Sequence, residues 1–200
     1  MNRKKLGLIL ITAAVLLALI TLGRSLYYAP NADSGLSLSG AAQGAAVVGA
    51  NIYNQPSRLI IPSLDIDAHI QLVGVTKSGN MAAPNNFTDI SWYKFGTVPG
   101  NSGSAVMAGH VDNALGTPAI FYELKELELG DDVYVVDKDG KRLHFQVIDK
   151  QLYPYDQAPI ERIFNDATGT YLNLITCQGE WVPRAKSAAN RLVVYTKLVE

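Results

Sequence analysis

The chain has 200 residues, of which 48% are apolar and 18% charged, a balance typical of one compact domain rather than of a disordered tail. Residues 1–24 contain four basic residues and no acid, so they carry +4; because the whole chain carries −1, the remainder carries −5. This distribution argues against nucleic-acid binding, which needs clustered Lys and Arg. Cys177 is the only cysteine, which excludes an internal disulfide, a cysteine-based zinc site and an iron–sulfur cluster.

An uncharged apolar stretch, residues 6–22, follows three basic residues and precedes Arg24. Its length is at the short end of what spans a bilayer, and the positive charge before it predicts a cytoplasmic N-terminus. We therefore expect a basic cytoplasmic end (1–5), a single-pass transmembrane signal anchor in the cell membrane (6–23) and an extracellular remainder. A cleaved signal peptide is the competing interpretation, but residues 25–30 offer no small-x-small cleavage site. A buried core helix is disfavoured because the stretch is apolar on every face.

Residues 24–55 form the next segment, and from about Pro30 to Gln55 it is rich in Ala, Gly, Ser and Asn, with one acid and no base. Such a composition has little to pack with and predicts a flexible linker. The segment could also fold back as a cover over a site, and the sequence leaves this alternative open.

Beyond Pro56, short β-type runs alternate with turn signals. Residues 138–141, Lys-Asp-Gly-Lys, are typical of a hairpin turn between two runs. Helical signals are brief and lie at residues 118–124 and 159–164. The pattern predicts one mostly β domain over residues 56–200, a barrel or a sandwich. The principal β-type runs are 59–61, 68–73, 104–108, 132–136, 144–148, 171–176 and 192–198.

His110 and Cys177 each end a β-type run and open a loop, a position from which a side chain reaches solvent on a rigid base. The other histidines, His69 and His144, lie within or at the start of predicted strands and are most simply structural. A lone thiol is usually buried and inert. A single cysteine in an outward-facing domain is nevertheless a candidate nucleophile.

A thiol attacks as the thiolate, which a neighbouring cation favours. Arg191 begins the last predicted strand, and pairing with the strand of Cys177 would bring the two residues together. Arg184, inside the connection between those strands, is the rival for this role. Either guanidinium could hold a substrate carbonyl or an oxyanion, and either could instead be a solvated charge.

Six segments in order resemble the sortases, membrane-anchored cysteine transpeptidases of Gram-positive and related bacteria, over roughly residues 58–200. Any one segment is weak, but their order, the sole cysteine and the apolar N-terminal stretch make the match strong. The segments are Arg58-Leu-Ile-Ile-Pro62; Trp92-Tyr-Lys-Phe-Gly96 with Pro99-Gly100 and Gly103-Ser-Ala-Val-Met-Ala-Gly-His110; Phe121-Tyr-x-Leu124; Leu129-Gly-Asp131; Leu174-Ile-Thr-Cys177; and Arg191-Leu-Val-Val-Tyr195.

The resemblance implies an eight-stranded β-barrel, with a groove floored near the strands of Cys177 and Arg191 and walled by residues 150–170. It implies that Cys177 attacks the threonine carbonyl of a Leu-Pro-x-Thr-Gly sorting signal, with His110 alternating as acid and base. Arg191 would stabilise the oxyanion, and Thr176 would line the site. An amine then resolves the thioester. The implied partners are surface proteins that bear the sorting signal and an amine acceptor such as a peptidoglycan cross-bridge or a pilin lysine.

Finer features bear on the sortase class. The Gly-His-Val-Asp112 segment is similar to the smaller class D, E and F members, whereas pilin-specific class C enzymes often carry an Asp-Pro-aromatic lid, and no such triplet precedes Arg58. Anchoring of surface proteins is therefore favoured over pilus polymerisation. Asp112 could orient His110 or only cap its loop. Arg184 stays open because some classes place the arginine slightly earlier.

Two alternatives come from other classes of protein. A peptidoglycan L,D-transpeptidase also uses a Cys/His pair, but its Ser-x-Gly-Cys-x-Arg neighbourhood is absent around Cys177. A non-catalytic extracellular β-barrel binding module would instead hold Cys177 as a buried structural thiol. Acids as dispersed as Asp89, Asp112 and Asp131 make no calcium site, and no cofactor motif is found, so we expect neither a metal nor a cofactor.

Overall fold

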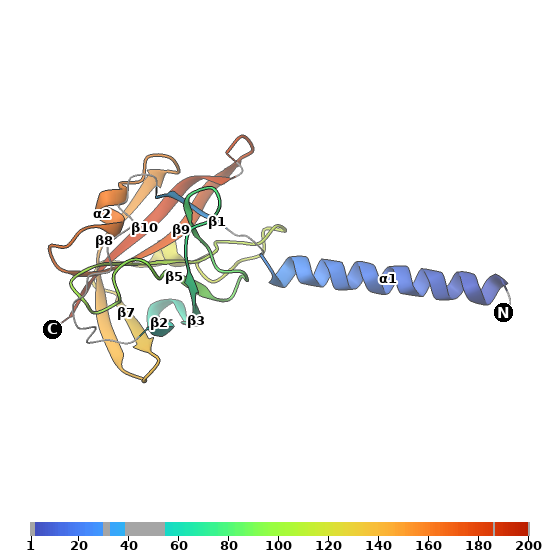
Figure 1. Ribbon diagram of the computed structural model, residues 1–200, viewed down its shortest axis with the longest axis horizontal. Coiled ribbons are helices and arrows are strands. Elements are labelled where there is room, and N and C mark those ends of the chain that lie inside the picture. Colours follow the sequence, from blue (N-terminus) through green and yellow to red (C-terminus); the bar gives the residue numbers. More distant parts are fainter. Residues whose placement is uncertain (1–2, 30–32, 39–54, 186, 200) are drawn as a thin grey trace.

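The computed structural model describes residues 3–29, 33–38, 55–185 and 187–199. A long N-terminal helix precedes a β-rich body and projects away from it (Figure 1). The elements in chain order are α1 (Arg3–Tyr27), β1 (Asp33–Ser37), β2 (Pro56–Ile61), the 3-10 helix η1 (Pro62–Leu64), β3 (Ile66–Val73), β4 (Asn80–Ala82), β5 (Ile90–Tyr93), β6 (Gly103–Ala108), the 3-10 helix η2 (Leu124–Glu126), β7 (Asp132–Asp137), β8 (Arg142–Pro154), α2 (Ile160–Phe164), β9 (Thr170–Val182) and β10 (Ser187–Leu198).

Eight of these strands close into a barrel in the order β10-β8-β7-β2-β3-β5-β6-β9, and β9 pairs with β10 to complete the ring. The β3–β5 and β6–β9 pairs are parallel and the other pairs are antiparallel. The mostly β fold and the eight-stranded barrel are confirmed. The predicted hairpin turn is also present between β7 and β8, where Gly140 adopts a φ of +83° that favours glycine.

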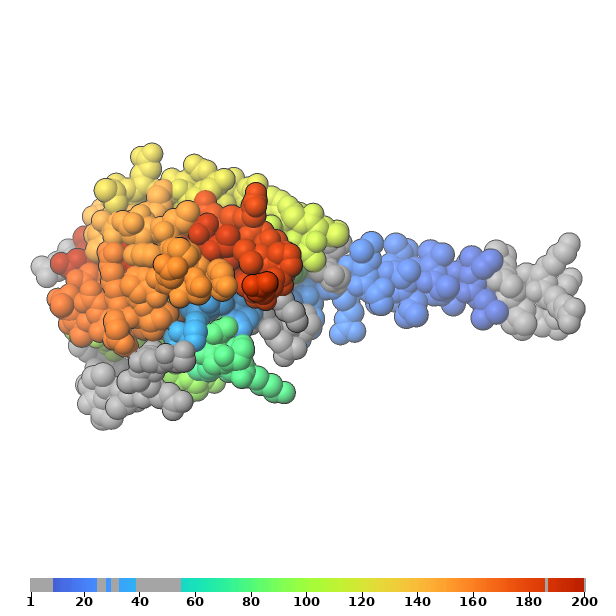
Figure 2. All heavy atoms as spheres, turned by 90° about the horizontal axis from the view of Figure 1, so that it is seen from above, coloured from blue at the N-terminus to red at the C-terminus, as the bar shows by residue number. Residues whose placement is uncertain are grey.

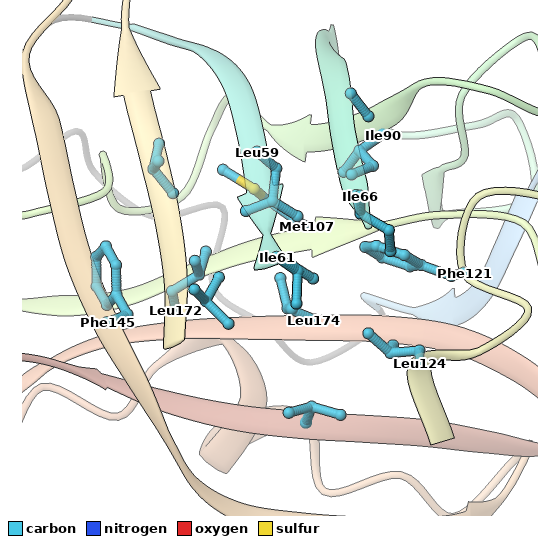
Figure 3. Close-up of a cluster of buried hydrophobic side chains, with 14 of the residues drawn as sticks. Leu59, Ile61, Ile66, Ile90, Met107, Phe121, Leu124, Phe145, Leu172 and Leu174 are labelled. Atoms are coloured by element: carbon cyan, nitrogen blue, oxygen red, sulfur yellow. The ribbon is translucent and has the colours of Figure 1, made fainter. Parts of the chain in front are cut away.

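The barrel interior holds the larger apolar core, in which Phe121 and Phe145 are fully buried (Figure 3). Successive side chains of a strand point to opposite faces, so the same strands also present an outer face. Leu192 and Val194 of β10 belong to the inner core, whereas Val193 and Tyr195 belong to a second apolar cluster on the outside. An apolar outer face needs a cover, because leaving it in water forfeits the free energy of burial.

Three elements outside the barrel supply that cover. Helix α2 contributes Ile163 and Phe164, strand β4 contributes Met81, and strand β1 contributes Leu36. Helix α2 confirms the helical signal predicted at residues 159–164. The signal at residues 118–124 corresponds instead to turns that end in the 3-10 helix η2.

Strand β1 lies inside the stretch 24–55 whose composition predicts a flexible linker. Its residues pair with β4 in an antiparallel ladder, with Asp33 opposite Ala82 and Ser37 opposite Asn80. Leu36 and Leu38 are two positions apart, so in an extended chain their side chains point to the same face. Both are buried against the outer cluster, and this burial explains why the segment folds onto the barrel. Residues 33–38 therefore belong to the folded domain, whereas most of the remaining linker, residues 39–54, lies outside the described residues.

Helix α1 covers the apolar N-terminal stretch, but the predicted membrane crossing is wrong. In the part of the chain that the structure describes, no helix is both long enough and apolar enough to cross a membrane. This finding corrects the predicted single-pass localisation, with its cytoplasmic N-terminus and extracellular domain.

Candidate functional site

Three neighbouring strands bring the candidate catalytic residues together. Cys177 on β9 lies directly opposite Arg191 on β10 in the antiparallel ladder. On its other side β9 runs parallel to β6, with Ala108 level with Ile175. Continuing that register by two residues places His110 level with Cys177. Adjacent strands are about 4.8 Å apart, so the two predicted partners flank the thiol from the two neighbouring strands.

Close packing fixes the strand end that carries His110. The Gly109 amide donates to the carbonyl of Ile175, and the hydroxyl of Thr176 donates to the Gly109 carbonyl at 2.9 Å. A Cβ at Gly109 would lie 2.6 Å from the ring of Phe121, so only glycine allows this approach to the core. The residue before the histidine is therefore held by two hydrogen bonds to the strand of Cys177.

The thiol of Cys177 is half-buried. Burial raises its pKa, while the positive charge of Arg191 lowers it and the carboxylates of Asp112 and Asp33 raise it further. Burial is the largest of these influences, so the pKa lies above the ordinary value of 9.0. In this state Cys177 is a neutral thiol at neutral pH and needs a base before it can attack.

His110 can act as that base. Its Nε2 lies 2.9 Å from the carbonyl oxygen of Pro84, and its ring packs against Phe87 with centroids 5.1 Å apart. Because a carbonyl only accepts hydrogen bonds, Nε2 carries the proton in the neutral ring and Nδ1 is the basic nitrogen. Burial lowers the pKa of His110, against smaller opposite effects of the Pro84 carbonyl and the Asp112 charge.

Arg191 is the largest fully buried side chain in the described structure, and its guanidinium is held by four hydrogen bonds. Nε donates to the carbonyl of Ser34 in β1 at 2.8 Å. The Nη1 and Nη2 groups donate to two carbonyls and a hydroxyl of β10, those of Ala188, Asn190 and Ser187. A guanidinium has five N–H donors, so one N–H, on Nη2, remains for another acceptor.

The structure separates the two arginines that the sequence leaves as rivals. Arg184 is exposed in the turn that joins β9 to β10, whose ladder still pairs Val182 with Ser187. Five strand positions separate Cys177 from Val182, which corresponds to about 16 Å at roughly 3.3 Å per residue. Arg191 is therefore adjacent to the thiol, and Arg184 is at the far end of the hairpin.

Asp112 and Thr176 occupy supporting positions. Asp112 is exposed, and its charge raises the pKa of both His110 and Cys177. Thr176 is buried, and its hydroxyl connects β9 to the end of β6. Both residues line a cleft of about 270 Å³ beside Cys177, whose other walls include Tyr122 and Lys125.

The other two histidines lie apart from this site. His69 is exposed on β3 opposite Arg58, and Nε2 of His144 contacts a carboxylate oxygen of Asp132 at 2.7 Å on the barrel surface. Within the described ranges, no group of three His, Cys, Asp or Glu side chains could hold a metal ion. The three candidate residues Cys177, His110 and Arg191 offer a thiol, an imidazole and a guanidinium.

Sequence reasoning missed the contribution of β1 to the site. The carbonyl of Ser34 binds Arg191, and Gly35 packs against the guanidinium so closely that a Cβ there would overlap Nη2. A signal was present in the alternation of Leu36 and Leu38, a period of two that is typical of a strand. The Ala- and Gly-rich composition around this short run masked it.

Comparison with known proteins is consistent with this arrangement. The family model for the sortase domain matches residues 59–199, which is more than half of the chain. No curated protein matches the sequence.

Solved structures share the fold at low sequence identity. Sortase C-1 from Actinomyces oris superposes with a TM-score of 0.58 at 23% identity, over 90% of this chain and 93% of that one. Sortase A from Corynebacterium diphtheriae gives 0.56 at 19% identity over 74% and 62%, and sortase C-1 from Streptococcus pneumoniae gives 0.55 at 19% over 72% and 66%. The chain thus spans just under two thirds of the length of these last two proteins. Because the family model matches residues 59–199, more than two thirds of the chain, the chain belongs to the sortase family.

Proposed function

We propose that this sortase cleaves a Leu-Pro-x-Thr-Gly-type sorting signal between threonine and glycine and transfers the threonine carbonyl to an amine. The proposal is supported by the β9–β10 register, in which Arg191 lies opposite the sole cysteine, and by the parallel β6–β9 pair, since His110 follows the end of β6. The carrier of the signal would be a surface protein, and the acceptor a primary amine such as that of a peptidoglycan cross-bridge or a pilin lysine. Attachment of surface proteins is favoured over pilus polymerisation.

The first half of the reaction forms a thioester. His110 accepts the thiol proton of Cys177 through Nδ1, and the thiolate attacks the threonine carbonyl carbon. The resulting tetrahedral oxyanion collapses, the carbon–nitrogen bond breaks, and the imidazolium donates its proton to the leaving glycine amine. The hydrogen bond from Nε2 to Pro84 holds the ring in the tautomer that this exchange requires.

The second half releases the product. An incoming primary amine attacks the thioester carbon, His110 takes its proton, and the second tetrahedral intermediate expels the Cys177 thiolate. The net reaction exchanges one amide bond for another, whereas attack by water would give hydrolysis. The cleft beside Cys177, with Asp112 in its wall, provides an open approach for the amine.

Arg191 would stabilise the oxyanion in both halves. A guanidinium keeps its charge and presents fixed donors, which suits an oxygen that becomes negative only in the transition state. One N–H on Nη2 is available as the structure stands. The Nε donor becomes available if the Ser34 carbonyl leaves.

A two-substrate assay tests the proposal. The full chain is incubated with a fluorescent Leu-Pro-x-Thr-Gly peptide library and with triglycine or a diaminopimelate-type amine, and products are read by mass. We expect a product in which the amine replaces the glycine after threonine, at a rate that depends on both substrates. Cleavage at another bond, or no cleavage of any sorting peptide, would contradict the proposal. In a parallel reaction with a peptidoglycan stem tetrapeptide in place of the sorting peptides, transfer of that peptide to the amine would favour the L,D-transpeptidase alternative.

A further inference from the structure

The loop between β4 and β5, residues 83–89, holds the imidazole of His110. The loop starts near the surface, where Figure 2 shows the green residues around β4 beside the light-blue residues 33–38, and it turns inward to the buried Pro84. The Pro84 carbonyl accepts from Nε2 of His110 at 2.9 Å, and Phe87 packs against the ring. The orientation of one main-chain carbonyl therefore decides which ring nitrogen carries the proton.

Gln71 binds the opposite side of the same peptide group. The peptide between Pro84 and Asn85 is trans and planar, so its carbonyl and its N–H point in opposite directions. The carbonyl faces His110. The N–H, that of Asn85, donates to Oε1 of Gln71 at 3.1 Å. The Gln71 side chain thus sets the plane of the peptide that binds the imidazole.

The Asp89 carboxylate orients Gln71 in turn. Strands β3 and β5 run parallel with Gln71 level with Ser91, so Asp89, directly before β5, lies close to Gln71. Its Oδ2 accepts from Nε2 of Gln71 at 2.8 Å and from Nδ2 of Asn86 at 2.9 Å. Because a carboxylate only accepts, the NH2 group of Gln71 must face Asp89, and its oxygen is left to face the Asn85 N–H.

Further hydrogen bonds keep the loop in this shape. Oδ1 of Asn86 accepts from the backbone amides of Thr88 at 3.1 Å and Asp89 at 2.8 Å, a local turn that closes the loop before β5. Nε2 of Gln71 also donates to Oδ1 of Asn85 at 2.9 Å. Both N–H groups and the oxygen of the Gln71 amide are therefore used, which holds this side chain in one position.

These bonds form one continuous chain from a carboxylate to the imidazole. The chain begins at the Asp89 carboxylate and passes through the Gln71 amide. It continues through the peptide of residues 84–85 and ends at Nε2 of His110. Hydrogen bonds in series polarise one another, and a bond to an ionised group is stronger than a neutral one. The negative end of the chain therefore strengthens the bond that keeps the proton on Nε2.

We propose that Gln71 and Asp89 are positioning residues for His110: through the intervening peptide they hold its ring in the tautomer that has the proton on Nε2. This inference rests on the proposed function, and it names two residues on which transfer of the thiol proton to Nδ1 depends. Without them the peptide can turn, and the tautomer with the proton on Nδ1, which cannot accept the thiol proton, gains population. Their loss slows proton transfer and leaves peptide binding unchanged.

Two full-length variants interrupt the chain of hydrogen bonds at different points. Gln71→Met removes every bond of the amide and keeps the length of the side chain. Asp89→Asn keeps an oxygen for both donors and removes only the charge. The matched control is Gln146→Met, because Gln146 also donates to a carboxylate, Oδ1 of Asp132 at 3.2 Å, but lies on β8, which pairs only with β7 and β10. Thermal unfolding checks that each variant is folded.

The kinetic readout is the rate of transfer of a sorting peptide to triglycine. We expect kcat to fall about tenfold in Gln71→Met and about threefold in Asp89→Asn, a part of the roughly 10²–10⁴-fold that general acid–base catalysis supplies. KM should not change, and Gln146→Met should match the wild type. Wild-type kcat in both loop variants would overturn the inference and leave the proposed function intact. Should Gln71→Met not fold, wild-type kcat in Asp89→Asn would overturn it alone.

Nitrogen-15 NMR supplies a readout that does not depend on turnover. Protonated and bare imidazole nitrogens resonate far apart, so the spectrum shows the tautomer of His110 at a pH well above 6.5, where its ring is neutral. The spectrum of His110→Gln identifies its signals. We expect only the Nε2–H tautomer in the wild type and in Gln146→Met, and a mixture of both tautomers in Gln71→Met.

The two readouts separate the inference from the proposed function. An unchanged tautomer in folded Gln71→Met would overturn the inference, whatever the rate of transfer. If the wild type transfers no sorting peptide although the tautomer of His110 responds to Gln71→Met, the proposed function fails and the positioning of the ring by Gln71 is confirmed.

Discussion

His110 and Arg191, the two residues predicted to flank Cys177, differ in how exposed they are and in how many of their hydrogen-bond donors are already used. His110, on the β6 side, is half-buried beside an open cleft, and its Nδ1 is the basic nitrogen. Arg191, on the β10 side, is fully buried, and four of its donors are taken by this chain. In the proposed mechanism, the side that would exchange protons is therefore open to the cleft, whereas the side that would stabilise the oxyanion is covered by the chain.

Removing the proposed nucleophile should have the largest effect, because both halves of the reaction depend on it. Cys177→Ala is expected to reduce peptide transfer to background, since no other thiol exists in the chain. The measurement is product formation by mass, together with thermal unfolding. An unchanged melting temperature would show that the barrel is intact. Residual transfer above background by this variant would refute the assignment of the nucleophile.

A substitution of His110 tests its proposed proton-transfer role. His110→Gln retains an N–H that can donate to the Pro84 carbonyl but has no group that titrates near neutral pH. We expect kcat to fall by about 10²–10⁴-fold, with little change in stability. His144→Gln, on the barrel surface, is the control and should keep wild-type rates. A His110→Gln enzyme as fast as that control would remove His110 from the mechanism.

Substitutions of Arg191 and Arg184 test which of the two arginines stabilises the oxyanion. Arg191→Lys keeps the charge but loses the fixed fork of donors, and we expect about a 10²–10³-fold loss in kcat. Arg184→Lys should be nearly neutral, because that residue lies at the exposed end of the hairpin. The melting temperature distinguishes a folding defect, since Arg191→Lys also leaves buried acceptors in β1 and β10. Equal, mild losses in both variants would leave the oxyanion partner unidentified and contradict the role given to Arg191.

The pH dependence follows from opposite shifts on the two reacting groups. Burial raises the pKa of Cys177 above 9.0 and lowers that of His110 below 6.5. Both residues are therefore neutral between these values, and only a small, pH-independent fraction is the thiolate–imidazolium pair. We expect a broad plateau of kcat/KM, with an acid limb below pH 6.5 and an alkaline limb above pH 9. Iodoacetamide labelling of Cys177 with a midpoint below pH 8 would contradict this.

Asp112 should have the smallest effect. Its charge raises the pKa of both His110 and Cys177, so Asp112→Asn is expected to lower both. Because the carboxylate is exposed and screened by water, the shifts should be small and shrink at high salt. The acid and alkaline limbs of the rate profile measure them. A large loss of kcat in Asp112→Asn would instead indicate that Asp112 orients the imidazole.

The barrel and the catalytic positions were predictable because their signals are local. The β-type runs, the Lys138–Lys141 turn and the strand end before His110 depend on alternation and turn chemistry that short windows reveal. The predicted strand end at Cys177 was wrong, because β9 continues to Val182 and pairs with β10 from Ser187 onward. Local signals left Arg184 open as a rival of Arg191, since the choice between them depends on the register of β9 against β10. Strand β1 could not be predicted, although folding back of residues 24–55 was left open, because the burial of Leu36 and Leu38 depends on an outer cluster assembled from distant strands. Composition alone also misled the membrane prediction for residues 6–22.

The central claim is that Cys177 carries the acyl group of a sorting peptide. Mass spectrometry of the full-length protein, quenched in acid after mixing with a library of Leu-Pro-x-Thr-Gly peptides in the absence of amine, tests it most directly. We predict a mass increase equal to the peptide up to its threonine, mapped to the fragment that contains Cys177 and lost when triglycine is added. An unmodified Cys177 under conditions in which a sorting peptide is cleaved, or an acyl group on another residue, would contradict the account.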